Sequence, residues 1–218
     1  MTKALTLIIV DDHPVFRSGL CHIIGAKPEY RLVGEAANGE AALALIEEKQ
    51  PDIALLDIEM PLKNGLEVAK EVLKKELPTR LVVLTMYADE QIFNEAMDLG
   101  VAGYVLKENA VSDVMNCLKA VAQGQYYISP TISGYLVERS KRRQTVLAAL
   151  PALETLTPAE WRILRFVAGN KTSKEIASDL SISYKTVENH RANIAEKLHL
   201  HGNNALLRFA LEKKSLLQ

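Results

Sequence analysis

Short apolar runs alternate with amphipathic stretches over the first 125 residues of the chain. The runs are residues 5–10, 32–36, 53–56, 81–84 and 102–106. Short, mostly apolar runs of this kind are typical of strands buried on both faces of a parallel sheet. The helix-like stretches between and after them are residues 14–24, 39–49, 66–77, 90–99 and 111–122. This alternation predicts a doubly wound α/β domain with a five-stranded parallel sheet.

Polar residues of particular kinds end these predicted strands. Asp11 and Asp12 follow the first strand, and Asp57 follows the third. Thr85 ends the fourth strand and Lys107 the fifth. In an open α/β sheet, ligands bind outside the carboxyl ends of the strands. Taken singly, each residue is most simply a turn former, a helix cap or a surface group. Together they predict a site at one rim of the sheet.

The predicted rim combines three carboxylates with a hydroxyl and an ammonium group. Crowded carboxylates repel one another unless a cation lies between them. Mg²⁺ is a hard ion that prefers oxygen ligands, and it commonly serves phosphoryl transfer. An aspartate beside such an ion can act as a nucleophile and form an acyl phosphate. Asp57, on the central run, is the favoured nucleophile, and Lys107 is placed to neutralise phosphoryl oxygens.

These residues resemble the receiver domain of two-component response regulators, a flavodoxin/CheY-like fold. The resemblance covers about residues 4–124, in order and with suitable spacing. It is carried by Asp11-Asp12, Asp57-Ile58-Glu59-Met60-Pro61 with Gly65, Leu84-Thr85-Met86, and Gly103-Tyr104-Val105-Leu106-Lys107. The resemblance implies that Asp57 accepts a phosphoryl group from a sensor histidine kinase. It also implies that Mg²⁺ is bound at Asp11, Asp12, Asp57 and the backbone carbonyl of Glu59, with Asp11 acting through a metal-bound water.

The same resemblance implies a conformational switch. Thr85 and Tyr104 match the family's switch pair, and Lys107 matches the lysine that pairs with the phosphoryl oxygens. Without the resemblance, Tyr104 is better explained as a half-buried strand aromatic with a hydrated hydroxyl. The chain departs from many receivers at Glu108, which follows Lys107 where a proline is common.

A connecting segment separates the two halves of the chain. Residues 131–143 have a helical pattern, and residues 140–144 are polar and basic. We interpret residues 126–152 as a partly helical linker. The predicted domains are therefore residues 1–125, the receiver, and residues 153–218.

The second half predicts an all-α domain of four helices. Thr157, Pro158 and Glu160 form a helix start with a capping box. A short helix over residues 172–180, a tight turn and a longer helix over residues 184–198 match a helix-turn-helix. A fourth helix is predicted over residues 203–213.

Residues 154–216 resemble the LuxR-type helix-turn-helix, which together with the receiver indicates a NarL/FixJ-type response regulator. The pattern is carried by Leu156-Thr157-Pro158, Glu160, Lys174-Glu175-Ile176-Ala177, Ile182-Ser183, Lys185 to Arg191, Asn193-Ile194 and Lys197-Leu198. Asn203 and Trp161 depart from it: an arginine is common at the first position and a polar residue at the second. The second helix of the pair is expected in the major groove. The residues expected to contact DNA are Lys174, Lys185, Thr186, Glu188, Asn189, His190, Arg191, Asn193 and Lys197.

Charge and composition agree with this division. Residues 1–130 contain 12 basic and 19 acidic side chains, a net charge of −7, whereas residues 131–218 contain 14 and 8, a net charge of +6. A basic end suits nucleic acid. Cys21 and Cys117 are too few for a disulfide framework and, with no signal-like N-terminus, indicate a reduced cytoplasmic compartment. The apolar runs are too short to span a bilayer, so no membrane partner is expected.

The favoured interpretation is a phosphorylation-controlled transcription regulator rather than an enzyme. Its expected partners are a sensor histidine kinase, double-stranded promoter DNA, a second copy of the chain and RNA polymerase. A phosphatase that forms an aspartyl phosphate is the alternative, but Glu59 stands where such enzymes have a second Asp, and no cap domain is inserted. A nucleotide-binding enzyme is disfavoured because no glycine-rich phosphate loop occurs. A receiver that serves only as a fixed dimer module is a third hypothesis.

Overall fold

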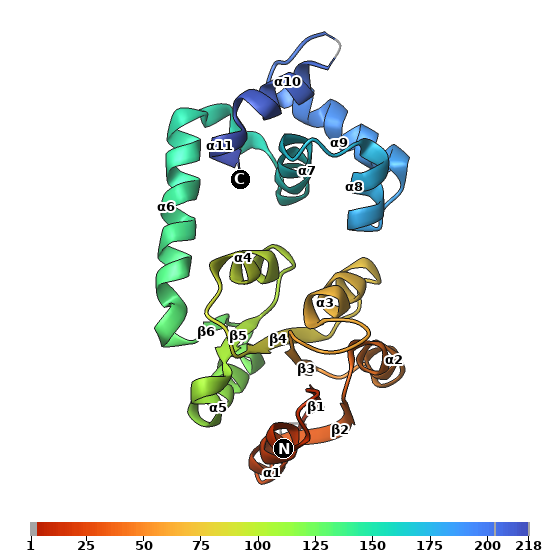
Figure 1. Cartoon of the computed structure of the whole chain (residues 1–218), viewed down its shortest axis with the longest axis vertical. Helices are drawn as coiled ribbons and strands as arrows, with labels where there is room; N and C mark the ends of the chain where they lie inside the picture. Colours follow the sequence, from red (N-terminus) through yellow and green to blue (C-terminus); the bar gives the residue numbers. More distant parts are fainter. Residues whose placement is uncertain (1–3, 203, 218) are drawn as a thin grey trace. The chain divides into compact units, whose positions relative to one another are not determined.

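The computed structural model describes residues 4–202 and 204–217, and the chain forms two compact units, Met1–Tyr135 and Leu136–Gln218 (Figure 1). No helix in the described ranges is both long enough and apolar enough to cross a membrane. Both cysteines, Cys21 and Cys117, are free thiols.

A fully parallel sheet organises the first unit. Its strands follow the order β2-β1-β3-β4-β5-β6. The order in which the chain adds strands reverses between β1 and β3, so the loops that follow these two neighbouring strands run to opposite faces of the sheet. The strands are β1 (Leu5–Val10), β2 (Tyr30–Ala36), β3 (Ile53–Asp57), β4 (Arg80–Thr85), β5 (Gly103–Leu106) and β6 (Tyr127–Ile128).

Helices cover both faces of this sheet, as Figure 1 shows. One apolar core lies under α2, α3 and α4, and a second lies under α1 and α5. Neighbouring strand residues alternate between the two cores, so that Ile8 joins the first and Leu7 the second. The helices are α1 (Pro14–Gly25), α2 (Gly39–Lys49), α3 (Gly65–Lys74), α4 (Glu90–Asp98) and α5 (Ala110–Ala122). The predicted doubly wound fold is confirmed.

The predicted number of strands was wrong, because the sheet has six. β6 lies within residues 126–152, the segment expected to be a linker, and pairs with β5 through Gly103 and Tyr127. A strand of only two residues is too short to give a periodic signal, so only the tertiary pairing reveals it. The segment continues through η2 (Pro130–Ile132), α6 (Ser133–Ala149) and η3 (Pro151–Thr155).

The second unit contains the predicted helix-turn-helix and one more helix than expected. After α6 and η3, its helices are α7 (Pro158–Ala168), α8 (Ser173–Leu180), α9 (Tyr184–Lys197), α10 (Ala205–Glu212) and α11 (Lys214–Leu217). The short α11 is the addition, and Leu217 at its end joins the apolar core. Capping boxes begin α7 and α8, at Thr157 with Glu160 and at Thr172 with Glu175. The departure noted at Asn203 lies outside the described residues.

Candidate functional site

The strand ends of the first unit bring four of the predicted residues together. Asp11 directly follows β1, Asp57 ends β3, Thr85 ends β4 and Lys107 directly follows β5. These strands are adjacent in the sheet, so their carboxyl ends share one rim. All four residues are at least nine-tenths buried, which is unusual for aspartate and lysine unless they are paired.

Lys107 pairs with two of the carboxylates. Its Nζ lies 2.8 Å from Oδ2 of Asp11 and 2.7 Å from Oδ2 of Asp57. Burial alone would lower the pKa of Lys107, but the two carboxylates raise it. Burial raises the pKa of Asp57, and the Lys107 ammonium opposes that change. The pocket therefore holds a charged lysine that fixes Asp57 in place.

Asp12 adds a third carboxylate to the pocket. Oxygen atoms of Asp11, Asp12 and Asp57 and a ring nitrogen of His13 all lie within 4.8 Å of one another. Lys107 can neutralise one of the three carboxylates, which leaves two negative charges. One divalent cation would balance these two charges. Carboxylate oxygens are the donors that Mg²⁺ prefers, so the residues present fit this ion.

His13 and Glu59 occupy different positions around this carboxylate cluster. The Nδ1 atom of His13 lies 2.8 Å from Oδ1 of Asp12, a contact that the sequence pattern did not predict. The side chain of Glu59 is exposed, and its backbone N–H donates to the carboxylate of Asp57. This hydrogen bond keeps the backbone of Glu59 beside the cluster, and the role of its carbonyl as a metal ligand stays a prediction.

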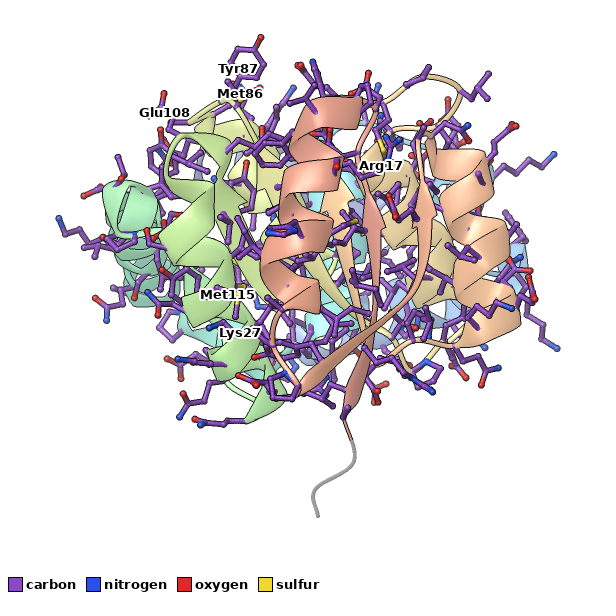
Figure 2. All side chains as sticks on the ribbon, turned by 90° about the horizontal axis from the view of Figure 1, so that it is seen from below. Arg17, Lys27, Met86, Tyr87, Glu108 and Met115 are labelled. Carbon is purple, nitrogen blue, oxygen red and sulfur yellow. The ribbon has the colours of Figure 1, made fainter. Side chains whose placement is uncertain are left out.

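Two residues of α1 that sequence reasoning missed support the pocket. The Phe16 ring centroid lies 5.0 Å from Nζ of Lys107, a cation–π arrangement. Arg17 donates from a guanidinium nitrogen to the carbonyl oxygen of Asp11 at 2.5 Å, and Nε lies 3.4 Å from Glu35. Figure 2 shows Arg17 toward the same end of the unit as Met86, Tyr87 and Glu108. Phe16 and Arg17 both lie in the first turn of α1, and the packing of this helix against the sheet brings them to the pocket.

Close packing of the loop after β3 fixes the backbone at Asp57. The backbone N–H of Gly65 donates to the carbonyl of Ile58 at 2.9 Å, and Asn64 and Glu67 form a capping box that begins α3. A side chain at Gly65 would collide with the carbonyl oxygen of Asp57. The glycine therefore permits α3 to begin directly against the strand that carries Asp57.

The two predicted switch residues have contrasting surroundings. The Thr85 hydroxyl accepts a hydrogen bond from the backbone N–H of Tyr87 at 3.2 Å. Tyr104 is fully buried, and its hydroxyl has no hydrogen-bond partner among the described residues. Its ring meets the ring of Phe93 edge-on, with centroids 5.3 Å apart. Burial raises the pKa of the Tyr104 hydroxyl. Glu108 lies in η1 (Lys107–Asn109), where no described peptide bond is cis.

In the second unit, α9 presents the predicted polar face. Val187 and Ile194 are buried against the unit's core. The side chains of this helix that are exposed are Tyr184, Lys185, Glu188, Asn189, Ala192, Asn193 and Glu196. His190 and Arg191 are partly exposed, and Lys174 is exposed on α8. An α-helix with such a face fits the major groove of DNA.

Two of the residues expected to contact DNA also make contacts within the unit. Nζ of Lys197 lies 2.7 Å from Oε2 of Glu160, the residue of the α7 capping box. The Thr186 hydroxyl lies 2.8 Å from that of Ser183, the N-cap of α9. Trp161, the other noted departure, donates from Nε1 to the carbonyl of Leu153 at 3.2 Å. These contacts stabilise the unit and leave the rest of the predicted set to face solvent.

Comparison with known families accounts for both units. The response regulator receiver domain matches residues 7–119, and the bacterial regulatory proteins of the luxR family match residues 154–210. The chain is a two-component response regulator of the NarL/FixJ type. The response regulator thus joins a receiver domain to a LuxR-type DNA-binding domain and belongs to a family of transcription regulators.

Relatives resemble this response regulator along nearly the whole chain. The transcriptional regulatory protein YdfI of Bacillus subtilis is 34% identical, over 95% of each chain. The nitrate/nitrite response regulator protein NarL of Escherichia coli is 33% identical, over 89% of each chain. A solved structure of a response regulator RcsB–DNA complex is 25% identical, covers 96% of this chain and 98% of that one, and has a TM-score of 0.59.

Proposed function

We propose that phosphorylation of Asp57 controls DNA binding by the LuxR-type domain. The pairing of buried Lys107 with the Asp57 carboxylate is the observation that carries the first half of this proposal. The Asp57 carboxylate attacks the phosphorus of a phosphohistidine on a sensor kinase, and the phosphorus–nitrogen bond breaks as the acyl phosphate forms. Lys107 then pairs with a phosphoryl oxygen. The response regulator turns over no small substrate beyond this transfer and the later hydrolysis of its own acyl phosphate.

The carboxylate cluster is the proposed site for Mg²⁺. Asp12, Asp57 and the backbone carbonyl of Glu59 would hold the ion directly, and Asp11 would hold it through a water molecule. When bound, the ion neutralises the carboxylates and the incoming phosphoryl group. Asp11 has a second role here, because it keeps Lys107 charged and directed toward Asp57.

Thr85 and Tyr104 are the proposed switch. A phosphoryl group on Asp57 offers strong acceptor oxygens to the Thr85 hydroxyl, which lies on the adjacent strand. Moving Thr85 removes the hydrogen bond that Tyr87 now donates to it. Tyr104, whose ring is buried, lies on the neighbouring strand β5. It pairs there with Val83 of β4, two residues before Thr85. The phosphorylation state thereby selects one arrangement of β4, β5 and α4.

DNA recognition is assigned to α9 and the start of α8. Asn189 and Asn193 suit adenine edges, Glu188 suits cytosine, and Lys185 and Lys174 suit phosphates. Arg191 and His190 complete the proposed contacting set. The response regulator would act in the cytoplasm on promoter DNA as a dimer, with half-sites about one helical turn apart, and alongside RNA polymerase. The RcsB–DNA structures among the relatives support this mode of action.

The test selects DNA fragments with and without acetyl phosphate and Mg²⁺. Wild-type protein should gain the mass of one phosphoryl group and select a DNA motif more tightly when phosphorylated. Asp57→Asn should lose both effects, whereas Glu40→Gln, a matched loss of charge at an exposed position, should keep them. Equal selection in every condition would refute control by phosphorylation. Failure to select any motif would refute sequence-specific binding.

The recognition helix is tested by alanine variants. Asn189→Ala should cost about 1–3 kcal/mol in binding its preferred site and relax specificity there. Lys185→Ala should weaken binding to all sequences and reduce its salt dependence. Lys214→Ala, an exposed charge on α11, is the control and should change neither.

A further inference from the structure

Three aromatic side chains form a row from the proposed switch to the start of the linker helix. Tyr104 on β5 meets Phe93 on α4 at 5.3 Å between centroids and 71° between planes. Phe93 in turn meets Tyr135 on α6 at 5.7 Å and 56°. All three residues lie within the first compact unit. The Phe93 ring contacts both tyrosines, so a movement of Tyr104 that shifts Phe93 also changes the packing of Tyr135.

A hydrogen bond gives Tyr135 a second connection to the same switch. Its hydroxyl donates to the carbonyl oxygen of Ala88 at 2.9 Å. Ala88 lies in the loop between β4 and α4, three residues after Thr85. The Thr85 hydroxyl holds the start of that loop through Tyr87, and Tyr135 holds its end. A movement of Thr85 toward a phosphoryl group therefore acts on the loop to which Tyr135 is bonded.

The segment before α6 is firmly attached to the receiver. The Ser129 backbone N–H donates to the carbonyl of Tyr104 at 2.9 Å. The buried Ser129 hydroxyl donates to Asp113 at 2.6 Å and accepts from the backbone N–H of Leu106 at 3.1 Å. Ile132 is buried in the same core as Tyr104. Because the segment is fixed at these points, α6 leaves the receiver from a defined position, with Tyr135 in its first turn.

We propose that Tyr135 is the coupling residue that passes the state of Thr85 and Tyr104 to α6, and through that helix to the DNA-binding domain. The inference rests on the proposed phosphorylation of Asp57. Tyr135 combines a ring contact, which follows Tyr104 through Phe93, with a hydrogen bond, which follows the loop after Thr85. Helix α6 continues beyond Tyr135 into the second unit, so its first turn is the point through which the receiver's state must pass along the chain.

The surroundings of the Tyr104 hydroxyl favour a side chain that can adopt two positions. It is buried and has no hydrogen-bond partner in the part of the chain that the structure describes, and burying an unpaired polar group is unfavourable. An arrangement with the hydroxyl in water is therefore a natural competitor of the one observed. Moving the Tyr104 ring would remove the edge-on contact with Phe93 and thereby release the ring on which Tyr135 packs.

The test measures the ratio of DNA affinities with and without beryllofluoride and Mg²⁺, a mimic of the phosphoryl group. Tyr135→Phe removes only the hydrogen bond to Ala88 and should reduce the wild-type ratio about threefold or more, within the ordinary range of allosteric coupling. Tyr135→Leu removes the ring as well and should bring the ratio close to one. Tyr126→Phe, a strongly exposed tyrosine nearby in the chain, is the control.

A second measurement separates coupling from damage to the fold. Phosphorylation by acetyl phosphate should reach the same stoichiometry in Tyr135→Phe as in wild type. By reciprocity, DNA should tighten the binding of beryllofluoride to wild type and should do so less in Tyr135→Phe. A ratio for Tyr135→Phe equal to that for Tyr126→Phe would overturn the inference. A wild-type ratio of one would instead refute the proposed function itself.

Discussion

A Cβ atom placed on Gly65 would lie 2.2 Å from the carbonyl oxygen of Asp57. No real Cβ makes so short a contact with backbone, so any side chain at this position must displace the start of α3 or the end of β3. The proposed phosphoacceptor therefore depends on a glycine eight residues further along the chain.

Gly65→Ala should impair phosphorylation as well as stability. The displaced backbone would move Asp57 away from Lys107, and we expect a loss of about 2 kcal/mol in the free energy of unfolding. Phosphorylation by acetyl phosphate should slow at least tenfold, measured by mass spectrometry over time. Gly19→Ala provides the control, since nothing lies within 4 Å of a Cβ there. Similar phosphorylation rates in the two variants would contradict this prediction.

Phe16→Leu should slow phosphoryl transfer without unfolding the receiver. Leucine keeps most of the apolar contact with the core but removes the aromatic face beside the Lys107 ammonium. A cation–π contact of this kind is worth about 1 kcal/mol, which corresponds to a rate change of about fivefold. The lysine ammonium protons should also move downfield in NMR spectra as the ring current is lost. An unchanged ammonium resonance would show that the ring does not lie over Lys107 in solution.

Ser129→Ala should destabilise the receiver out of proportion to the one atom removed. The change leaves the backbone N–H of Leu106 and the buried carboxylate of Asp113 without their shared partner. Unpaired buried groups cost about 1–3 kcal/mol each, so urea unfolding should show a loss of about 2 kcal/mol. Ser133→Ala is the control and should lose less stability, because the Ser133 hydroxyl donates its hydrogen bond to the carbonyl of Pro130 at an exposed position. Equal stability of the two variants would argue against the buried network.

Glu160→Gln should weaken the DNA-binding domain in a pH-dependent way. Burial would raise the pKa of Glu160, but Lys197 and the Thr157 hydrogen bonds together lower it. A lowered pKa in the folded state means that the carboxylate stabilises the domain above its ordinary value of 4.5, and that this contribution disappears as the pH falls through the folded value.

Glu160→Gln should lose about 1–2 kcal/mol in the free energy of unfolding at pH 7. This loss is smaller than for a fully buried ion pair because a third of the Lys197 side chain is exposed. Trp161 is the single tryptophan of the chain, and its fluorescence reports unfolding of this domain. Wild type and Glu160→Gln should converge in stability as the pH falls below the lowered pKa of Glu160 in the folded domain. A constant difference between them at every pH would show that the carboxylate charge is not responsible.

The sequence pattern predicted the receiver rim because the chemistry there is local to each strand end. An apolar run that stops at Asp11, Asp57 or Lys107 identifies the end of a strand, and parallel topology then brings those ends together. The helix cap at Thr157 was equally accessible, because a capping box depends on residues three positions apart.

Contacts between distant parts of the chain could not be predicted in this way. Lys197 has the charge and the position of a phosphate contact, and only the fold shows its pairing with Glu160, 37 residues earlier. Phe16 is a typical core residue in the sequence, and its place beside Lys107 depends on how α1 packs against the sheet. The contacts of Tyr135 could not be predicted either, since its partners Phe93 and Ala88 are more than 40 residues away in the sequence.

The sixth strand has a practical consequence for anyone preparing the receiver as a separate fragment. A cut after residue 125 would remove Tyr127 and Ile128 and leave the N–H and carbonyl groups of β5 open along one edge. Such an edge invites pairing with another chain and hence aggregation. It would also remove Ser129, the hydrogen-bond partner of Leu106 and Asp113. A fragment that ends after Tyr135 retains all of these groups and is the better starting material for phosphorylation assays in isolation.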